Sequence, residues 1–151
     1  MRLYLNTSAY NRPFDDLTVD RVRVEAEAVA SLLAAVEEGR AVLVGSEYLD
    51  FEVAQTPDQD RARRVRALLQ AVDTRIAMTP ALVARARALE RHGLRGLDAL
   101  QVAAAETGKA DLLVTTDDRL VKRAARAGVE IATRIVYPPE ALVELFRTEN
   151  R

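Results

Sequence analysis

Short apolar runs that alternate with longer amphipathic stretches constrain the fold of this chain more than any other feature of its sequence. The runs Ala41–Val44 and Leu112–Val114 have strand length and no polar residue, as expected of strands buried on both faces. Between such runs lie longer stretches with apolar residues at helical spacing. Strands joined by helices favour right-handed crossovers and a parallel sheet. We therefore expect a three-layer α/β/α fold with a mainly parallel sheet of about five strands, formed by residues 1–151 as a single domain.

Capping residues and turn residues set the expected ends of the helices. Ser46 is the expected N-cap of one helix, and Thr56 with Pro57 and Gln59 forms a capping box for the next. Gly39 follows the first long helix, at a position where glycine adopts a left-handed conformation with little strain. The expected strands are residues 2–5, 40–45, 74–78, 111–115 and 129–136. The expected helices begin near residues 18, 47, 56, 79, 96, 117 and 138. Residues 11–16 are expected to form a turn.

Composition excludes several kinds of chemistry. The chain has no cysteine and a single histidine, His92, which rules out disulfides, thiolate nucleophiles and zinc fingers. The net charge of −1 gives no overall attraction to nucleic acid or membrane, so contact with a polyanion requires a local basic patch. No signal peptide or membrane-spanning run is present in the sequence, and we expect a cytoplasmic protein with no membrane contact.

Polar residues directly follow three of the expected strands. Asn6 follows the first strand, Glu47 follows the second, and Asp117 comes shortly after the strand at 111–115. Ligands of open α/β sheets bind beyond the carboxyl ends of the strands, where all three positions are expected to lie. The sequence therefore predicts that amide and carboxylate oxygens gather at one edge of the sheet.

A fourth acid, Asp98, lies within an unusually apolar helical stretch. Burying an unpaired carboxylate there is unfavourable, whereas a bound cation or a polar neighbour such as Gln101, one turn later, would remove the difficulty. Oxygen ligands without nearby histidine or cysteine are typical of a hard cation, Mg²⁺ or Mn²⁺. Such a site activates water and neutralises the charge that develops on a phosphodiester under in-line attack.

Each of these acids also has an ordinary structural explanation. Asp117 or its neighbour Asp118 is suited to the N-cap or first turn of the helix that follows, where the helix dipole favours negative charge. Glu47 and Asp98 fit the first turns of their own helices in the same way. The metal-site hypothesis depends on all of them meeting in space.

Four segments together resemble the PIN-domain family of metal-dependent ribonucleases, which includes the VapC-type toxins of bacterial toxin–antitoxin pairs. They are Leu3–Ser8, Ser46-Glu47, Leu97–Ala103 and Val114–Leu120. The resemblance implies a Mg²⁺ or Mn²⁺ site that cuts RNA, a homodimer, and inhibition by a cognate antitoxin protein. By position it assigns the acidic, catalytic and metal-binding positions to Asn6, Glu47, Asp98 and Asp117. Asp118 is then an accessory carboxylate or a helix cap.

Two residues depart from the family pattern. Asn6 stands where the family has an aspartate, and each lost unit of charge pairing is worth about 4 kcal/mol at 4 Å before solvation offsets it. Metal affinity and activity are therefore expected to fall sharply. Asn6 belongs either to a natural member with weakened activity or to a chain whose aspartate has been replaced to silence a toxic nuclease, and we favour replacement. Gln101 stands where many relatives carry histidine, at a position expected to lie behind the ligands.

Three basic residues are candidates for binding RNA phosphate. Arg119 and Lys122 follow the acidic edge directly, and Arg12 lies in a segment with an aromatic residue near the same edge. Ion pairing with the acidic site or with an antitoxin is the alternative for Arg119 and Lys122. Packing of its own loop is the alternative for Arg12.

The sequence thus predicts a metal-dependent endoribonuclease of the toxin type, impaired by Asn6. A non-catalytic PIN-fold module that binds RNA or protein is the alternative, in which the acids serve as helix caps. A receiver-type signalling domain is disfavoured, since the sequence lacks adjacent acids after the first strand and a lysine after the last.

Overall fold

A five-stranded parallel sheet forms the centre of the molecule, as a computed structural model of residues 1–150 shows. The strands are β1 (Arg2–Leu5), β2 (Val42–Ser46), β3 (Thr74–Ile76), β4 (Leu112–Val114) and β5 (Arg134–Val136). The α-helices are α1 (Thr7–Asn11), α2 (Asp20–Glu37), α3 (Glu47–Ala54), α4 (Gln59–Leu68), α5 (Pro80–Arg91), α6 (Gly96–Thr107), α7 (Asp118–Arg126) and α8 (Pro138–Glu149). Two short 3₁₀ helices, η1 (Arg12–Phe14) and η2 (Leu69–Ala71), complete the described elements.

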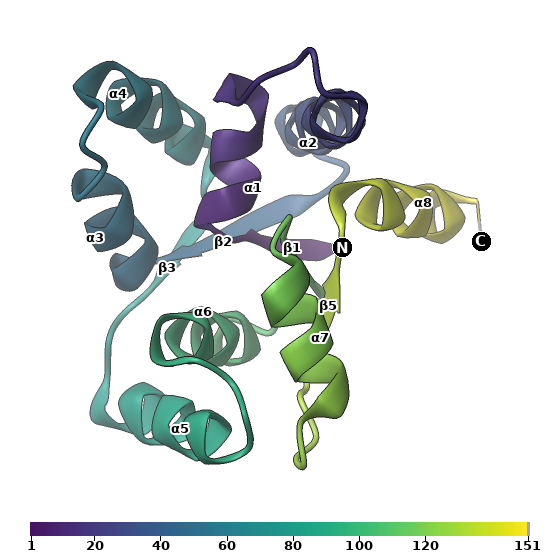
Figure 1. Ribbon diagram of the computed structural model, residues 1–151. Helices are drawn as coiled ribbons and strands as arrows, with labels where there is room; N and C mark the ends of the chain where they lie inside the picture. The colour runs from purple at the N-terminus through teal and green to yellow at the C-terminus, as the bar shows by residue number, and fades with distance from the viewer. Residues whose placement is uncertain (151) are drawn as a thin grey trace.

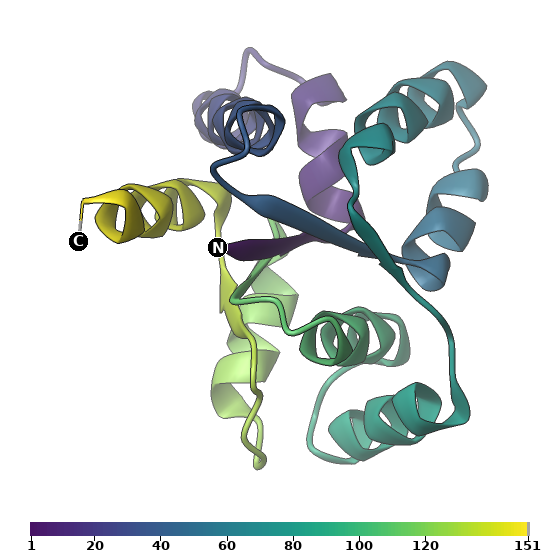
Figure 2. The same ribbon diagram turned by 180° about the vertical axis from the view of Figure 1, so that it is seen from behind.

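Helices cover both faces of the sheet, as expected for parallel strands. Helices α1, α2, α4 and α8 lie on one side, and α5, α6 and α7 lie on the other (Figures 1 and 2). This arrangement confirms the predicted three-layer α/β/α fold with a parallel sheet.

The strand order is β3-β2-β1-β4-β5, so the chain first builds outward from β1 in one direction and then in the other. Leu3 of β1 is paired with Leu43 on one side and with Leu112 on the other. The order therefore reverses between β1 and β4, and the crevice beyond the carboxyl ends of these two strands is where open α/β sheets bind ligands. Helices α1, α3 and α7 begin at this edge, because each directly follows a strand that ends there.

Several predicted helix ends are confirmed by the capping contacts. The Ser46 hydroxyl accepts a hydrogen bond from the amide of Leu49, and Thr79 does the same for Leu82. Gly39 has φ +75°, the left-handed conformation expected after α2. The predicted capping box at Thr56 is wrong, because α4 begins later and Asp58 is its N-cap. An aspartate carboxylate competes well for this position.

Two segments differ from the sequence prediction. The expected turn at 11–16 is mostly helical, because α1 occupies residues 7–11 and η1 follows it directly. The last strand is 134–136 rather than 129–136.

One connected apolar core lies on both faces of the sheet. Close packing against this core explains why a glycine occupies position 108, the C-cap of α6. A Cβ atom there would lie 2.6 Å from Cγ1 of Val44. Within residues 1–150, none of the helices combines the length and the apolar character that crossing a bilayer requires.

Candidate metal centre at the carboxyl edge of the sheet

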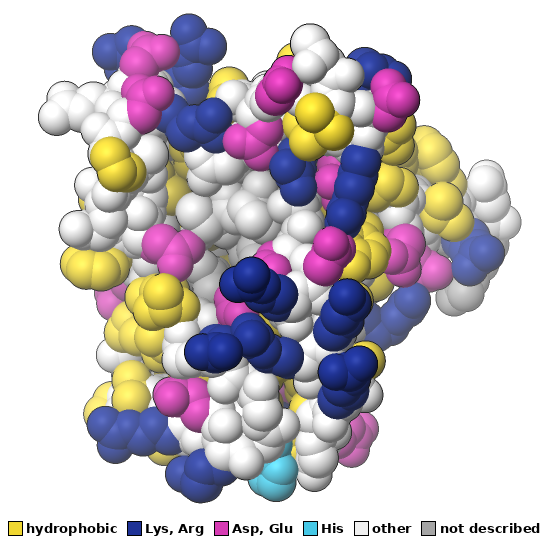
Figure 3. All heavy atoms as spheres, in the orientation of Figure 1, with side chains coloured by type: hydrophobic (Ala, Val, Ile, Leu, Met, Phe, Trp, Pro, Cys, Tyr) yellow, Lys and Arg dark blue, Asp and Glu magenta, His cyan; other side chains and the backbone are white. Residues whose placement is uncertain are grey.

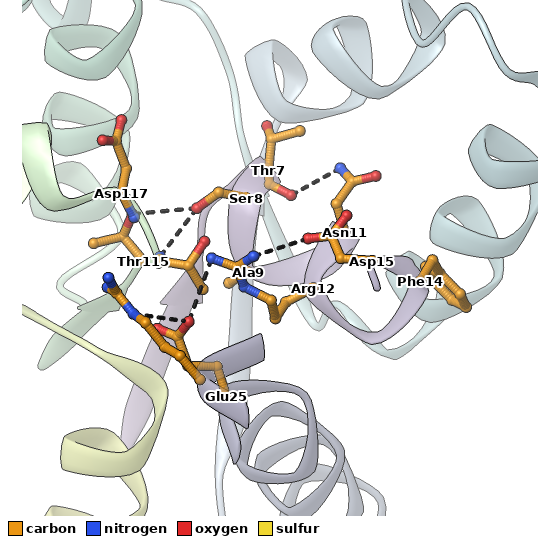
Figure 4. Close-up of polar contacts among 12 residues, drawn as sticks. Thr7, Ser8, Ala9, Asn11, Arg12, Phe14, Asp15, Glu25, Thr115 and Asp117 are labelled. Carbon is orange, nitrogen blue, oxygen red and sulfur yellow. Dashed lines mark hydrogen bonds and ion pairs between the residues drawn. The ribbon is translucent and has the colours of Figure 1, made fainter. Parts of the chain in front are cut away.

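Asn6 lies at the reversal point of the strand order and is buried. Its side-chain oxygen accepts hydrogen bonds from the Ser8 hydroxyl, at 2.8 Å, and from the amide of Ala9, so it is the N-cap of α1. Its side-chain NH₂ donates to Oγ1 of Thr115 at 2.8 Å, across the gap between β1 and β4. Ser8 and Thr115 lie side by side in Figure 4. The amide is thus fixed by contacts on both sides.

Asp98, in the first turn of α6, lies in an environment that disfavours its charge. Partial burial raises the pKa of its carboxyl group, and the negative charges of Asp117 and Glu52 raise it further. The guanidinium groups of Arg123 and Arg95 act in the opposite direction without cancelling the effect. The carboxylates of Asp117, at the start of α7, and Glu52, in α3, therefore lie close enough to Asp98 to disfavour its charge.

The acid that α3 contributes is Glu52, which sequence reasoning did not identify. Oε1 of Glu52 accepts hydrogen bonds from the hydroxyl of Thr7 and, at 3.4 Å, from the side-chain amide of Gln101. Its Oε2 accepts from the Tyr48 hydroxyl at 3.2 Å. Glu47, the predicted residue, is exposed, and its Oε2 accepts a hydrogen bond from the backbone amide of Met78, just beyond β3.

The direction of helical side chains explains this difference. Side chains on a helix point back toward its N-terminus, so the sheet edge beneath α3 is covered by a residue from its second turn. Glu52 lies there, whereas Glu47 is the first residue of the helix. A search for acids immediately after strands misses Glu52, and a search one to two turns into the helix would find it.

Asp117 and Asp118 are adjacent and have different environments. Asp117 is the N-cap of α7, where its Oδ1 accepts a hydrogen bond from the amide of Arg119 at 2.9 Å. The carboxylate of Asp118 instead binds the guanidinium group of Arg21 and the hydroxyl of Tyr137, and these hydrogen bonds hold its pKa far below the usual range. Asp117 thus has the capping role that the sequence allowed, and a free carboxylate oxygen beside Asp98 as well.

A buried polar chain lies behind the acids. The phenol of Tyr4 donates to Oε1 of Gln101. Because the phenol has one hydrogen, the Ser46 hydroxyl, 2.8 Å away, is the donor of the second contact. Gln101 in turn donates to Thr7 and Glu52, so it holds the glutamate in place.

Arginines surround the acidic pair on the surface. A cavity of about 520 Å³ is lined by both Asp98 and Asp117 and by three arginines, Arg95, Arg119 and Arg123. Figure 3 shows basic side chains gathered around acidic ones on this face. Arg119 therefore lies where the sequence predicted, and Arg95 and Arg123 join it.

The other predicted basic residues lie differently. Lys122 is exposed on α7 and does not line this cavity. Arg12 faces away from solvent and pairs with Asp15 at 3.1 Å and with the buried carboxylate of Glu25 at 3.3 Å (Figure 4). These contacts fit the alternative that the sequence left open, in which Arg12 holds its own segment in place.

The donor set fits a hard divalent cation in its chemistry. The side chains at the edge offer carboxylate, amide and hydroxyl oxygens, and a cation would offset both the burial and the neighbouring negative charges that raise the pKa of Asp98. Within residues 1–150, no three His, Cys, Asp or Glu side chains lie close enough to hold an ion by themselves. Waters and substrate oxygens would therefore complete its coordination, which is usual for Mg²⁺.

Comparison with known proteins agrees with this geometry. A family model described as the PIN domain matches residues 5–127. No curated protein matches the chain in sequence.

Solved structures with the same fold include VapBC2 from Rickettsia felis, bound to a DNA fragment from its promoter. That comparison has a TM-score of 0.57 and 15% identity, and covers 91% of this chain and 98% of the other. FitAcB from Neisseria gonorrhoeae gives a TM-score of 0.55 and 16% identity, with 90% and 97% covered. PAE2754 from Pyrobaculum aerophilum gives 0.56 and 17% identity, with 97% and 90% covered. At these identities the likeness is one of fold.

Proposed function

Because the chain belongs to the PIN-domain family, we propose that it is a metal-dependent endoribonuclease whose active form carries an aspartate at position 6. One observation carries the proposal: Asp98 and Asp117 line one cavity at the carboxyl edge, where Asn6 is buried, and Glu52 is close enough for its charge to act on Asp98. The sequence hypothesis is retained with one change, since Glu52 takes the role first given to Glu47.

The chemistry divides between a cation and the side chains. A Mg²⁺ or Mn²⁺ ion held by Asp98 and Asp117, with Glu52 in reach directly or through water, would supply Lewis acidity for the attack of water on phosphorus. Thr7, Gln101 and Tyr48 orient the two oxygens of Glu52.

The arginines supply the substrate contacts. Arg95, Arg119 and Arg123 line the cavity beside the acids and bind the phosphates that flank the scissile bond. The water oxygen forms the new bond to phosphorus, and the bond from phosphorus to the leaving ribose oxygen breaks.

The test compares this chain with Asn6→Asp and with two further changes made in that background. Asn6→Asp should bind Mn²⁺ at least about tenfold more tightly than the unmodified chain and should cleave single-stranded RNA in its presence. Adding Glu52→Gln should remove most of that gain. Adding Glu47→Gln should leave it intact, because Glu47 bonds to the backbone of Met78 instead.

Calorimetric Mn²⁺ titration and a gel assay on diverse RNAs provide the two readouts. If Asn6→Asp neither binds Mn²⁺ nor cleaves RNA, the enzymatic proposal fails. If Glu47→Gln is as harmful as Glu52→Gln, the assignment of the α3 ligand is wrong.

The toxin role is part of the same proposal. VapBC2 and FitAcB share this fold, and we infer that this chain is the toxin of a toxin–antitoxin pair, acting in the cytoplasm as a homodimer that a cognate antitoxin inhibits. Expression of Asn6→Asp should arrest growth, and co-expression of a small protein encoded next to its gene should relieve the arrest. Arrest that no neighbouring product relieves contradicts the antitoxin part.

A non-catalytic binding module is the second candidate, favoured by the hydrogen bonding of Asn6. Its amide already satisfies Ser8, Ala9 and Thr115, so the edge is complete without a cation. In that case both the unmodified chain and Asn6→Asp bind RNA with equal affinity and cleave none.

A further inference from the structure

The carboxylate of Asp118 is fully engaged on the side of α7 that faces α2 and α8. Its two oxygens accept from the guanidinium group of Arg21 at 3.0 and 2.6 Å, and Oδ1 also accepts from the hydroxyl of Tyr137 at 2.8 Å. A carboxylate with these partners has little capacity left for a metal ion. Asp118 is therefore neither an accessory ligand nor the cap of α7.

Arg21 is itself held in place from two directions. Its guanidinium carbon lies 5.5 Å from the centroid of the Tyr137 ring, in a cation–π contact. Its Nε lies 3.4 Å from Oε1 of Glu25, a buried carboxylate that also pairs with Arg12 (Figure 4). The three residues Arg21, Asp118 and Tyr137, here termed the α7 clamp, are thus anchored to the inside of the molecule through Glu25.

Outside the clamp, helix α7 is attached through a few side chains. Leu120 is its single buried residue, Val121 and Ala124 are half-buried, and Ala124 packs against the apolar core. Asp117 is the N-cap of this helix, so its position follows the position of the first turn. The α7 clamp holds the same first turn of α7 through Asp118, the residue after Asp117.

We propose that the α7 clamp is a positioning device that fixes Asp117 against Asp98 and Glu52, with Asp118 acting through the backbone of α7 and not on the substrate. The inference rests on the proposed metal site. Arg21 and Asp118 are about half exposed, at 52% and 46% of their side-chain area, so the pair adds little to global stability. Its effect is therefore local, on the placement of one ligand.

The experiment uses the full chain, with and without Asn6→Asp, and adds Asp118→Asn or Tyr137→Phe. Arg23→Gln is the matched control, because Arg23 belongs to the same helix as Arg21 and, among residues 1–150, forms an ion pair with Asp20 alone, on the surface. The readouts are Mn²⁺ affinity by calorimetry, hydrogen exchange at the Arg119 amide by NMR, and the melting temperature.

Asp118→Asn should weaken Mn²⁺ binding by about tenfold in the Asn6→Asp background, a typical effect of changing a residue that orients a ligand. The same change should speed exchange at the Arg119 amide, with or without Asn6→Asp, while the melting temperature stays near that of the parent. Tyr137→Phe should act in the same direction and more weakly. Arg23→Gln should change neither readout.

The outcomes separate this inference from the proposed function. Unchanged exchange at Arg119 overturns the clamp, whatever the metal does. Faster exchange with unchanged Mn²⁺ affinity overturns the positioning role. If Asn6→Asp binds no Mn²⁺ at all, the proposed function fails, and the clamp is judged by exchange at Arg119 alone.

Discussion

The side-chain amide of Asn6 and the hydroxyl of Thr115 lie 2.8 Å apart, and their hydrogen bond ties the end of β1 to the segment after β4. The same asparagine caps α1 through its carbonyl oxygen. A carboxylate in this place keeps a capping oxygen, and it keeps the contact with Thr115 if the threonine hydroxyl turns to donate. The fold therefore accepts either residue, and the difference between them is one of charge.

Removing the capping oxygen at position 6 should be measurable. Asn6→Ala should lower the free energy of unfolding by about 1 to 2 kcal/mol, because the N-cap of α1 and the contact with Thr115 are both lost. Asn6→Ser retains a capping oxygen and should recover about half of that loss. Urea unfolding of the three chains gives the comparison, and equal stability of Ala and Ser variants would contradict a capping role.

Introducing a negative charge at position 6 should make stability depend on divalent cations. In Asn6→Asp, free Mn²⁺ at about 100 times its dissociation constant should add about 2.7 kcal/mol to the free energy of unfolding. Chelation with EDTA should reverse the gain. Thermal melts of Asn6→Asp with and without Glu52→Gln test this expectation, and a gain that survives the loss of Glu52 would place the ion elsewhere.

Tyr4 and Tyr10, the two fully buried tyrosines, should respond differently to loss of their hydroxyl groups. Tyr4→Phe should destabilise by about 1 to 3 kcal/mol, because Gln101 and Ser46 lose their partner. The Tyr10 hydroxyl is buried with no hydrogen-bond partner among residues 1–150, so Tyr10→Phe should be neutral or stabilising. Chemical denaturation measures both, and a larger loss for Tyr10→Phe would contradict the contacts described.

The raised pKa of Asp98 gives a prediction about pH. Burial, assisted by the charges of Asp117 and Glu52, raises the pKa of Asp98 above its unfolded value, so its ionisation opposes folding as the pH rises through the folded pKa. Asp98→Asn should therefore stabilise the metal-free chain at pH 7. The gain should vanish below about pH 4, near the unfolded pKa of an aspartate, where the carboxyl group is protonated in both states.

Asp16 provides the control of opposite sign. Hydrogen bonds from the Thr18 hydroxyl and amide lower the pKa of Asp16. Its stabilising effect is thus present above the unfolded pKa and lost as the pH falls. We compare the melting temperatures of Asp98→Asn and Asp16→Asn with that of the parent between pH 3 and 8, a range set by the aspartate pKa of about 4. As the pH rises, the difference from the parent should grow in opposite directions for the two variants. A parallel response would contradict the opposite pKa shifts of Asp98 and Asp16.

Close packing at the end of α6 should make Gly108 intolerant of substitution. A Cβ atom there would lie 2.6 Å from Cγ1 of Val44 and 3.2 Å from Cγ1 of Ile76. Gly108→Ala should therefore destabilise by about 1 to 3 kcal/mol. The double variant Gly108→Ala/Val44→Ala should lose less free energy of unfolding than the two single changes lose together. A double-mutant cycle of unfolding free energies measures this difference. Strict additivity would mean that another contact is responsible.

The fold was largely predictable from the sequence, because its main signals are local. Buried strands such as Leu112–Val114 have no polar residue, and Ser46 and Thr79 cap helices as such residues usually do. Helix α1 was missed because its polar residues resemble a turn, and its N-cap, Asn6, had been interpreted only as a ligand. Competing caps at Thr56 and Asp58 could not be ranked by pattern alone.

The candidate site was predictable in part. Asp98 and Asp117 line the same cavity, as the metal-site hypothesis expected: Asp117 follows β4 at the carboxyl edge, and α6 brings Asp98 to it. Glu52 depends on how α3 is rotated about its axis, which is decided by packing and not by local sequence. The ion pairs of Arg12 and Arg21 are also tertiary, and no spacing in the sequence indicates them.

The central position of β1 has a consequence for synthesis on the ribosome. Leu3 of β1 completes its pairing only with Leu112 of β4, so the middle strand waits for a partner that is synthesised much later. Contacts this distant in the chain form slowly and late. A nascent chain therefore has no assembled carboxyl edge until β4 has been synthesised.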